Sequence, residues 1–183
     1  MAEPVDVRGL WNEAVSVNEA QRGTVKRKLE ADAAARERIA KALGLDSLER
    51  LEAAMTAGPW LDGVEIAGRW SARVGQTCGV TLEPFESELE GEIHVRALPP
   101  GSAALGGPDS GGGELDLDPE ADDPPDLLEG KEIDLGAYVV EDLSLAIDPF
   151  PRKPGASFEA PAQPGEPSPF AVLAKLKGGA PDA

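Results

Sequence analysis

The chain has 183 residues, the size of one domain with tails. Its 17 Lys and Arg stand against 34 Asp and Glu, so the formal net charge is −17. This charge disfavours binding to a phosphate backbone and excludes a histone-like or polybasic role. The 21 Gly and 17 Pro make up about a fifth of the chain, against about an eighth in average usage. The folded part must therefore be shorter than the whole chain.

The first third of the chain contains three candidate elements. Residues 24–29 alternate in polarity and are compatible with a strand. Residues 32–43 are predicted to form a helix, because Asp32 can cap its start, apolar residues recur at intervals of four, and Gly44 follows where a terminal glycine belongs. Residues 48–57 fit both a helix and a strand. We predict a strand, since a sheet of only two strands is marginally stable.

The clearest periodicity lies in residues 64–74 and 89–97. Apolar or small residues occupy the even positions of the first segment and the odd positions of the second, with mostly polar residues between them. Each segment is therefore predicted to be a half-buried strand. The connection from Gly75 to Pro84 favours an antiparallel hairpin with an irregular tip.

A strongly acidic segment follows the hairpin. Residues 99–149 hold one basic and 14 acidic residues, and 13 of the 32 residues in 99–130 are Gly or Pro. Such a segment lacks the apolar area to offset the entropy of ordering, so 99–130 is predicted to be a disordered acidic loop. Its candidate partner-binding residues are Asp116, Asp118, Glu120, Asp122 and Asp123.

The last predicted element is a helix over 134–147. Its apolar residues form one stripe, Asp134 can cap its start, and Pro149 prevents its continuation. The Pro-rich residues 159–183 are predicted to be a flexible tail. The expected fold is α+β: one domain over 1–158, with an antiparallel sheet, open or barrel-like, flanked by two or three helices.

Cys78 and His94 are the only cysteine and histidine of the chain. Cys78 falls at the hairpin tip, where a thiol at a strand end faces solvent or a partner, and we predict a small, partly buried apolar residue. In the hairpin register His94 lies opposite about residue 68, roughly 30 Å from Cys78 at about 3.3 Å per residue. A Cys–His dyad is therefore not expected, and His94 is interpreted as a surface residue.

No catalytic residues, metal or cofactor are predicted. The acidic loop lacks the spacing of an EF-hand, and its Gly-rich part lacks the Lys-Ser/Thr of a phosphate loop. Trp60 and Trp70 are interpreted as core anchors, because few basic residues surround them to hold a nucleic acid. No apolar run is long enough to span a membrane, and the charged N-terminus is unlike a secretory peptide. A cytoplasmic protein is expected.

Several sequence blocks together resemble the YceD family. The blocks follow one another in the family's order, at 67–78, 81–85, 123–130, 133–136, 141–146 and 148–155. The motif residues that carry over are Cys78, Leu82, Glu83, Pro84, Asp134, Leu135, Glu141, Pro149 and Pro151. The resemblance covers residues from about 64 to 158 and assigns none of these residues a chemical role.

The resemblance implies a role in ribosome assembly. Members of this family are bacterial and plastid proteins without known catalytic activity, associated with accumulation of large-subunit (23S) ribosomal RNA. Many carry Cys-x-x-Cys-Leu-Glu-Pro and have been suspected of binding metal; here Thr81 replaces the second cysteine, and one thiolate cannot replace two.

The charge points to a basic protein rather than RNA as the direct partner. A chain of −17 is expected to engage a large-subunit precursor through a basic ribosomal protein or assembly factor. The alternatives are an acidic interaction adaptor unrelated to ribosomes, and a thiol- or metal-dependent protein that uses Cys78.

Overall fold

The computed structural model describes residues 7, 9–105 and 124–158. The elements follow in the order β1 (Ala14–Ser16), α1 (Val17–Arg22), β2 (Val25–Glu30), α2 (Ala33–Leu43), β3 (Ser47–Trp60), β4 (Gly63–Thr77), β5 (Pro84–Leu98), the 3-10 turn η1 (Ala103–Leu105), β6 (Asp126–Leu127), β7 (Glu132–Asp134) and α3 (Leu135–Ala146). The predicted α+β class is confirmed, and residues 48–57 lie in a strand, as predicted.

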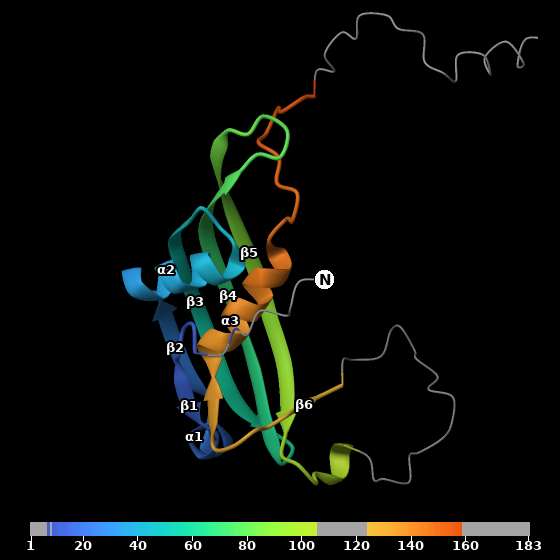
Figure 1. The fold of residues 1–183 in the computed structure, drawn as a ribbon. Coiled ribbons are helices and arrows are strands. Elements are labelled where there is room, and N and C mark those ends of the chain that lie inside the picture. Colours follow the sequence, from blue (N-terminus) through green and yellow to red (C-terminus); the bar gives the residue numbers. More distant parts are fainter. Residues whose placement is uncertain (1–6, 8, 106–123, 159–183) are drawn as a thin grey trace, which may run out of the picture.

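The main sheet has the strand order β2-β3-β4-β5-β6 (Figure 1). The pairs β2–β3, β3–β4 and β4–β5 are antiparallel, and β4 and β5 form the predicted hairpin, with Ala67 opposite His94. The short strand β6 pairs parallel to the end of β5, so the sheet is not antiparallel throughout. The sheet stays open, with β2 and β6 as its outer strands, and β1 pairs with β7 in a separate two-stranded ribbon.

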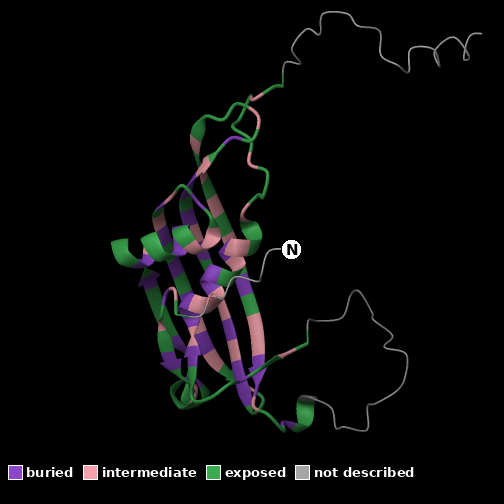
Figure 2. Ribbon diagram, viewed as in Figure 1, coloured by how far each residue is buried: buried purple, intermediate pink, exposed green. Residues whose placement is uncertain are grey.

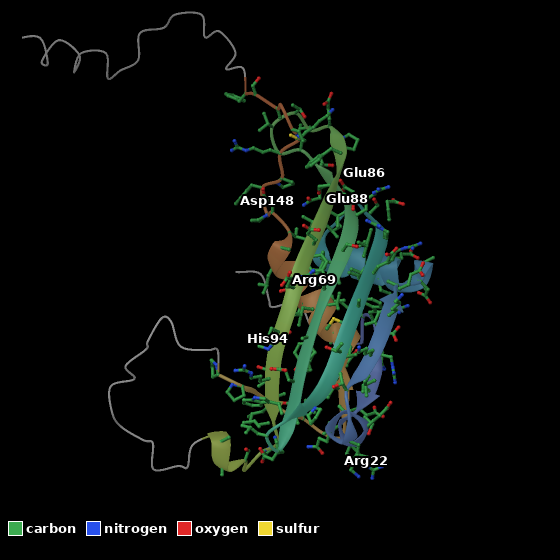
Figure 3. The ribbon with its side chains drawn as sticks, turned by 180° about the vertical axis from the view of Figure 1, so that it is seen from behind. Arg22, Arg69, Glu86, Glu88, His94 and Asp148 are labelled. Carbon is green, nitrogen blue, oxygen red and sulfur yellow. The ribbon has the colours of Figure 1, made fainter. Side chains whose placement is uncertain are left out.

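One face of the sheet forms the core, and the helices cover that face (Figures 1 and 2). The predicted alternation in β4 is observed, because Val64, Ile66, Trp70, Ala72 and Val74 are all buried. Burying these side chains against the helices supplies the main favourable term in folding. The opposite face carries polar and charged side chains (Figure 3).

Both long helices begin at the predicted caps. The Asp32 carboxylate accepts from the amide of Ala35 at 2.7 Å, and Gly44 ends α2 with a φ of 68°, in the left-handed region that favours glycine. The Asp134 carboxylate accepts from the amides of Gly136 and Ala137 at the start of α3. The α3 helix ends at Ala146, one residue before the predicted end.

The acidic segment is more structured at its ends than predicted. Residues 99–105 contain η1, and residues 124–130 contain β6. Leu128 is buried, and its amide donates to the carbonyl of Leu98 at 2.8 Å. Burial of an apolar residue offsets part of the ordering cost, which is why these ends depart from the disorder predicted over 99–130. Residues 106–123, with the five candidate partner-binding acids, and the tail 159–183 lie outside the described residues.

Candidate functional site

The tip of the β4–β5 hairpin is built by residues 78–83. The amide of Cys78 donates to the carbonyl of Glu83, and the amide of Leu82 donates to the carbonyl of Cys78, both at 2.9 Å. Leu82 has a φ of 57°, a conformation that a non-glycine residue seldom adopts, and its side chain is 77% exposed. The tip therefore holds a leucine in solvent at a backbone position that favours glycine.

The segment that follows α3 runs back to this tip (Figure 1). The Gly79 amide donates to the carbonyl of Pro151 at 2.9 Å, and the Lys153 ammonium lies 2.9 Å from the Glu83 carboxylate. The motif block around Cys78 and the block 148–155 therefore meet in space, although about 70 residues separate them along the chain. We call this meeting point, residues 76–84 with 148–154, the tip junction.

The sulfur of Cys78 lies inside the tip junction. Its residue exposure is 0%, and Sγ accepts hydrogen bonds from the amides of Thr81 at 3.5 Å and Lys153 at 3.4 Å. The side-chain hydrogen bond from Thr81, together with backbone amides of which Lys153 contributes most, lowers the pKa of Cys78 to about 6. The predicted burial of Cys78 is observed and is complete rather than partial, whereas the expected exposure to solvent or a partner is wrong. The sulfur also serves as a hydrogen-bond acceptor.

The Cys78 environment favours a thiolate that holds the tip junction together. Thiolate chemistry on a substrate requires access to the sulfur, and this sulfur is enclosed by the hairpin tip and the 148–154 segment. Thr81, at the position of the second motif cysteine, directs a hydrogen bond to the sulfur. In the part of the chain that the structure describes, no three His, Cys, Asp or Glu side chains group as metal ligands.

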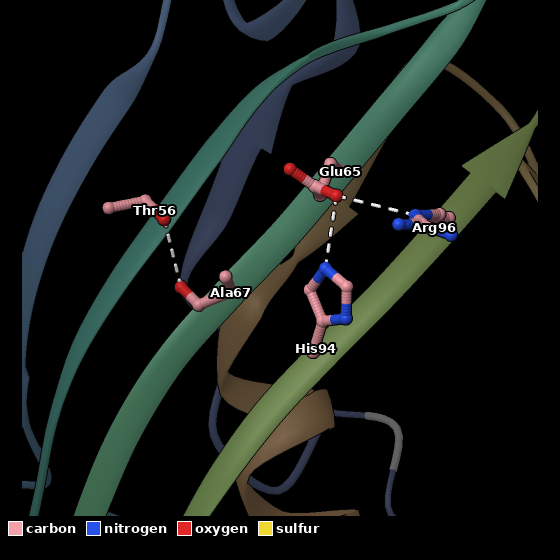
Figure 4. Close-up of polar contacts among 5 residues, drawn as sticks. All are labelled: Thr56, Glu65, Ala67, His94 and Arg96. Atoms are coloured by element: carbon pink, nitrogen blue, oxygen red, sulfur yellow. Dashed lines mark hydrogen bonds and ion pairs between the residues drawn. The ribbon is translucent and has the colours of Figure 1, made fainter. Parts of the chain in front are cut away.

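His94 forms a row of ion pairs with Glu65 and Arg96 on the open sheet face (Figure 4). In the strand register it lies far from Cys78 along the hairpin. Its Nε2 is 3.0 Å from Oε1 of Glu65, and Nε of Arg96 is 3.3 Å from the same oxygen. These hydrogen bonds, that of His94 first, lower the pKa of Glu65. The Arg96 guanidinium also lies 5.2 Å from the centre of the Trp60 ring. Trp60 is thus half-buried at the end of its strand and not the predicted core anchor, whereas Trp70 is buried as predicted.

The remaining motif residues divide into structural and exposed positions. Asp134 caps α3 and also accepts from the amide of Glu13 at 2.9 Å, which ties the N-terminal region to the helix. Leu135 is fully buried, whereas Glu141 and Pro149 are exposed.

Two structurally important positions, Asp142 and Gly91, escape sequence reasoning. The Trp70 indole Nε1 donates to Oδ2 of Asp142 at 2.6 Å, and Gly91 leaves the space for this contact. A Cβ at Gly91 would lie 2.5 Å from the Asp142 carboxylate and 2.6 Å from the indole nitrogen. The only signal in the sequence is a glycine in the apolar register of a strand, which can indicate a close approach.

Four of the nine motif residues, Cys78, Glu83, Asp134 and Pro151, thus join segments that lie far apart along the chain. The family model described as large ribosomal RNA subunit accumulation protein YceD matches residues 66–177. The chain therefore belongs to the YceD family. A search of curated proteins and a search of solved structures each gave no match. Among the described residues, none of the helices is long and apolar enough to cross a membrane.

Proposed function

We propose that this protein is a non-catalytic ribosome-assembly factor that supports accumulation of large-subunit (23S) rRNA. The observation that carries the proposal is the family match over residues 66–177, whose description names large ribosomal RNA subunit accumulation. The protein acts in the cytoplasm, where the large subunit is assembled.

The contacts of the motif residues support a binding role rather than catalysis. Cys78, the chief candidate for covalent chemistry, is 0% exposed, and Asp134 is engaged as a helix cap. A nucleophilic site needs an accessible nucleophile with a base in hydrogen-bond reach. The single histidine contacts Glu65 on the open sheet face, at a distance from the tip.

The charge supports a basic protein as the direct partner. With a net charge of −17, the chain repels the phosphate backbone of rRNA at long range and attracts Lys- and Arg-rich proteins. The five acids Asp116, Asp118, Glu120, Asp122 and Asp123 add to this attraction. Complementary charge raises the rate of encounter with such a partner. The partner is a basic ribosomal protein or assembly factor on the large-subunit precursor.

A deletion strain tests the proposal. Loss of the gene should lower the ratio of large-subunit to small-subunit rRNA, and expression of the full chain should restore the ratio. The protein should also co-sediment with large-subunit precursors in sucrose gradients. An unchanged rRNA ratio across growth temperatures would contradict the proposal.

A further inference from the structure

The strand β5 has a long free edge. β5 extends from Pro84 to Leu98, but its outer neighbour β6 pairs only with Ala97 and Leu98. Within the described residues, no strand lies beside the outer side of residues 85–96. In Figure 3 this edge borders the open face, with Glu86, Glu88 and His94 labelled along it.

The direction of the free backbone groups follows from one hydrogen bond. The Leu98 carbonyl accepts from the amide of Leu128, so it points away from β4. Because backbone groups alternate between the two sides of a strand, residues with the same parity as Leu98 direct both N–H and C=O to the outer edge. In the described part of the chain, no hydrogen bond is recorded to these groups at Glu86, Glu88, Glu90, Glu92 and His94.

The helix α3 covers the face of β5 and not these groups. The space above Gly91 is filled by Asp142 of α3 and by Trp70, on the core face of the sheet. The even-numbered residues of β5 have their side chains on the opposite, open face, and Glu86, Glu88, Glu90 and Glu92 are all exposed. Their edge therefore combines unused backbone groups with a row of carboxylates.

The charges of this row select the partner. Glu88 pairs with Arg50 and Arg73, and Glu92 pairs with Arg69. No ion pair is recorded for Glu86 and Glu90 in the described structure. The other outer strand, β2, instead carries Lys26, Arg27 and Lys28, a common way to block edge pairing. In one antiparallel register of two β5 strands, Glu86 would face Arg96 and Glu88 would face His94, so self-pairing is an outcome that the test distinguishes.

We propose that the β5 edge binds an extended Lys- and Arg-rich segment of a partner protein as an added antiparallel strand. Main-chain hydrogen bonds to the even-numbered residues supply the affinity, and basic side chains opposite Glu86, Glu88, Glu90 and Glu92 supply the selectivity. This inference rests on the proposed function, because it places the basic partner of the assembly factor on one strand.

The test uses the full chain and a synthetic peptide of alternating lysine and threonine. In the added strand, the lysines opposite the glutamates direct their own amides to β5, whereas the threonine amides point away. The peptide that is N-methylated at every lysine should bind with an affinity at least about tenfold lower. Loss of a single hydrogen bond at the upper end of its usual net contribution already accounts for this factor. Peptide N-methylated at every threonine has the same charge and should bind like the unmodified peptide. The readout is the amide NMR spectrum, with shifts confined to β5.

The protein variant Glu86→Gln with Glu90→Gln should weaken binding about three- to tenfold at low salt, as expected for two exposed charge pairs. The matched variant Glu30→Gln with Glu52→Gln removes two carboxylates from β2 and β3 and should bind like the wild type. Equal binding of the two methylated peptides, shifts outside β5, or no binding would overturn the inference. Self-association that shifts β5 amides without peptide, alone or together with β2 amides, would also overturn it, because a second copy would then occupy the edge.

The failure of this inference can be told apart from failure of the proposed function. If deletion of the gene lowers the rRNA ratio but the peptide does not bind β5, the edge is excluded and the assembly role stands. If the rRNA ratio is unchanged on deletion, the assembly role fails, and the inference fails with it.

Discussion

The indole of Trp70 and the carboxylate of Asp142 join the sheet to the helix α3 through a hydrogen bond of 2.6 Å. Trp70 is 3% exposed and lies at the centre of β4, whereas Asp142 lies in α3, 72 residues further along the chain. Because a buried indole N–H needs an acceptor, this bond fixes where α3 sits on the sheet.

Asp142→Ala should destabilise the protein by about 1–3 kcal/mol, because it leaves the buried Trp70 N–H without its acceptor. Trp70→Phe removes the donor, and in that background Asp142→Ala should cost less. The free energies of urea unfolding of the wild type, the two single variants and the double variant form a double-mutant cycle, which gives the coupling energy between Trp70 and Asp142. A coupling energy near zero would show that the bond contributes nothing beyond packing.

Gly91→Ala should destabilise the protein by about 1–3 kcal/mol, because the added Cβ would overlap the contact between Trp70 and Asp142. Gly79→Ala is the matched control: its Cβ would lie 3.7 Å from the Pro151 carbonyl, an ordinary contact, and its amide stays in place. Thermal unfolding of the two variants measures the difference. Equal stability of both would mean that β5 and α3 move apart freely.

The stabilisation from Cys78 should increase with pH. Its pKa is lowered from 9.0 to about 6 in the folded chain, so between these values the unfolded state binds a proton that the folded state does not. The stability is fully present above the unfolded pKa and is lost as the pH falls through about 6. Cys78→Ala should therefore lose more stability at pH 9 than at pH 6, measured by urea unfolding in reductant.

Thr81→Val is the control for this pH dependence. It removes the hydroxyl that contributes most to the lowered pKa and leaves the backbone amides, so its pH dependence should lie between those of wild type and Cys78→Ala. A difference between wild type and Cys78→Ala that does not change with pH would show that Cys78 is a neutral thiol.

Chelator should leave the thermal midpoint of the protein unchanged. Thr81 stands where the second motif cysteine is expected, and a single thiolate with no grouped His, Asp or Glu in the described residues is a poor zinc site. Elemental analysis that finds one bound zinc per chain would contradict this expectation.

Binding to large-subunit precursors should weaken steeply with salt and with loss of loop charge. Between 0.1 and 1 M salt the Debye length falls from about 10 Å to about 3 Å. The variant with Asn or Gln at Asp116, Asp118, Glu120, Asp122 and Asp123 should fold normally and bind precursors more slowly. Full restoration of rRNA by this variant in the deletion strain, with unchanged co-sedimentation, would mean that the loop only keeps the protein soluble.

The elements with strong local signals follow from the sequence by itself. An alternation of period two predicts β4 and β5, and Asp32, Gly44 and Asp134 mark helix ends that the structure confirms. These signals are local, since a strand has side chains on alternate faces and a helix end needs a nearby acceptor or a glycine. The motif blocks also suffice to place the chain in its family.

The contacts between distant segments were decided only by the tertiary structure. The strands β1, β6 and β7 have two or three residues each, too few to show a period, and β6 exists because it pairs with the end of β5. Cys78 is enclosed because the segment after α3 returns to the hairpin tip. There the amide of Lys153, 75 residues further along the chain, donates to the Cys78 sulfur. Local sequence patterns predict the hairpin of neighbouring strands, but they do not say which distant segments the folded chain brings together. The complete burial of Cys78, its lowered pKa and the free edge of β5 therefore emerge only from the assembled fold.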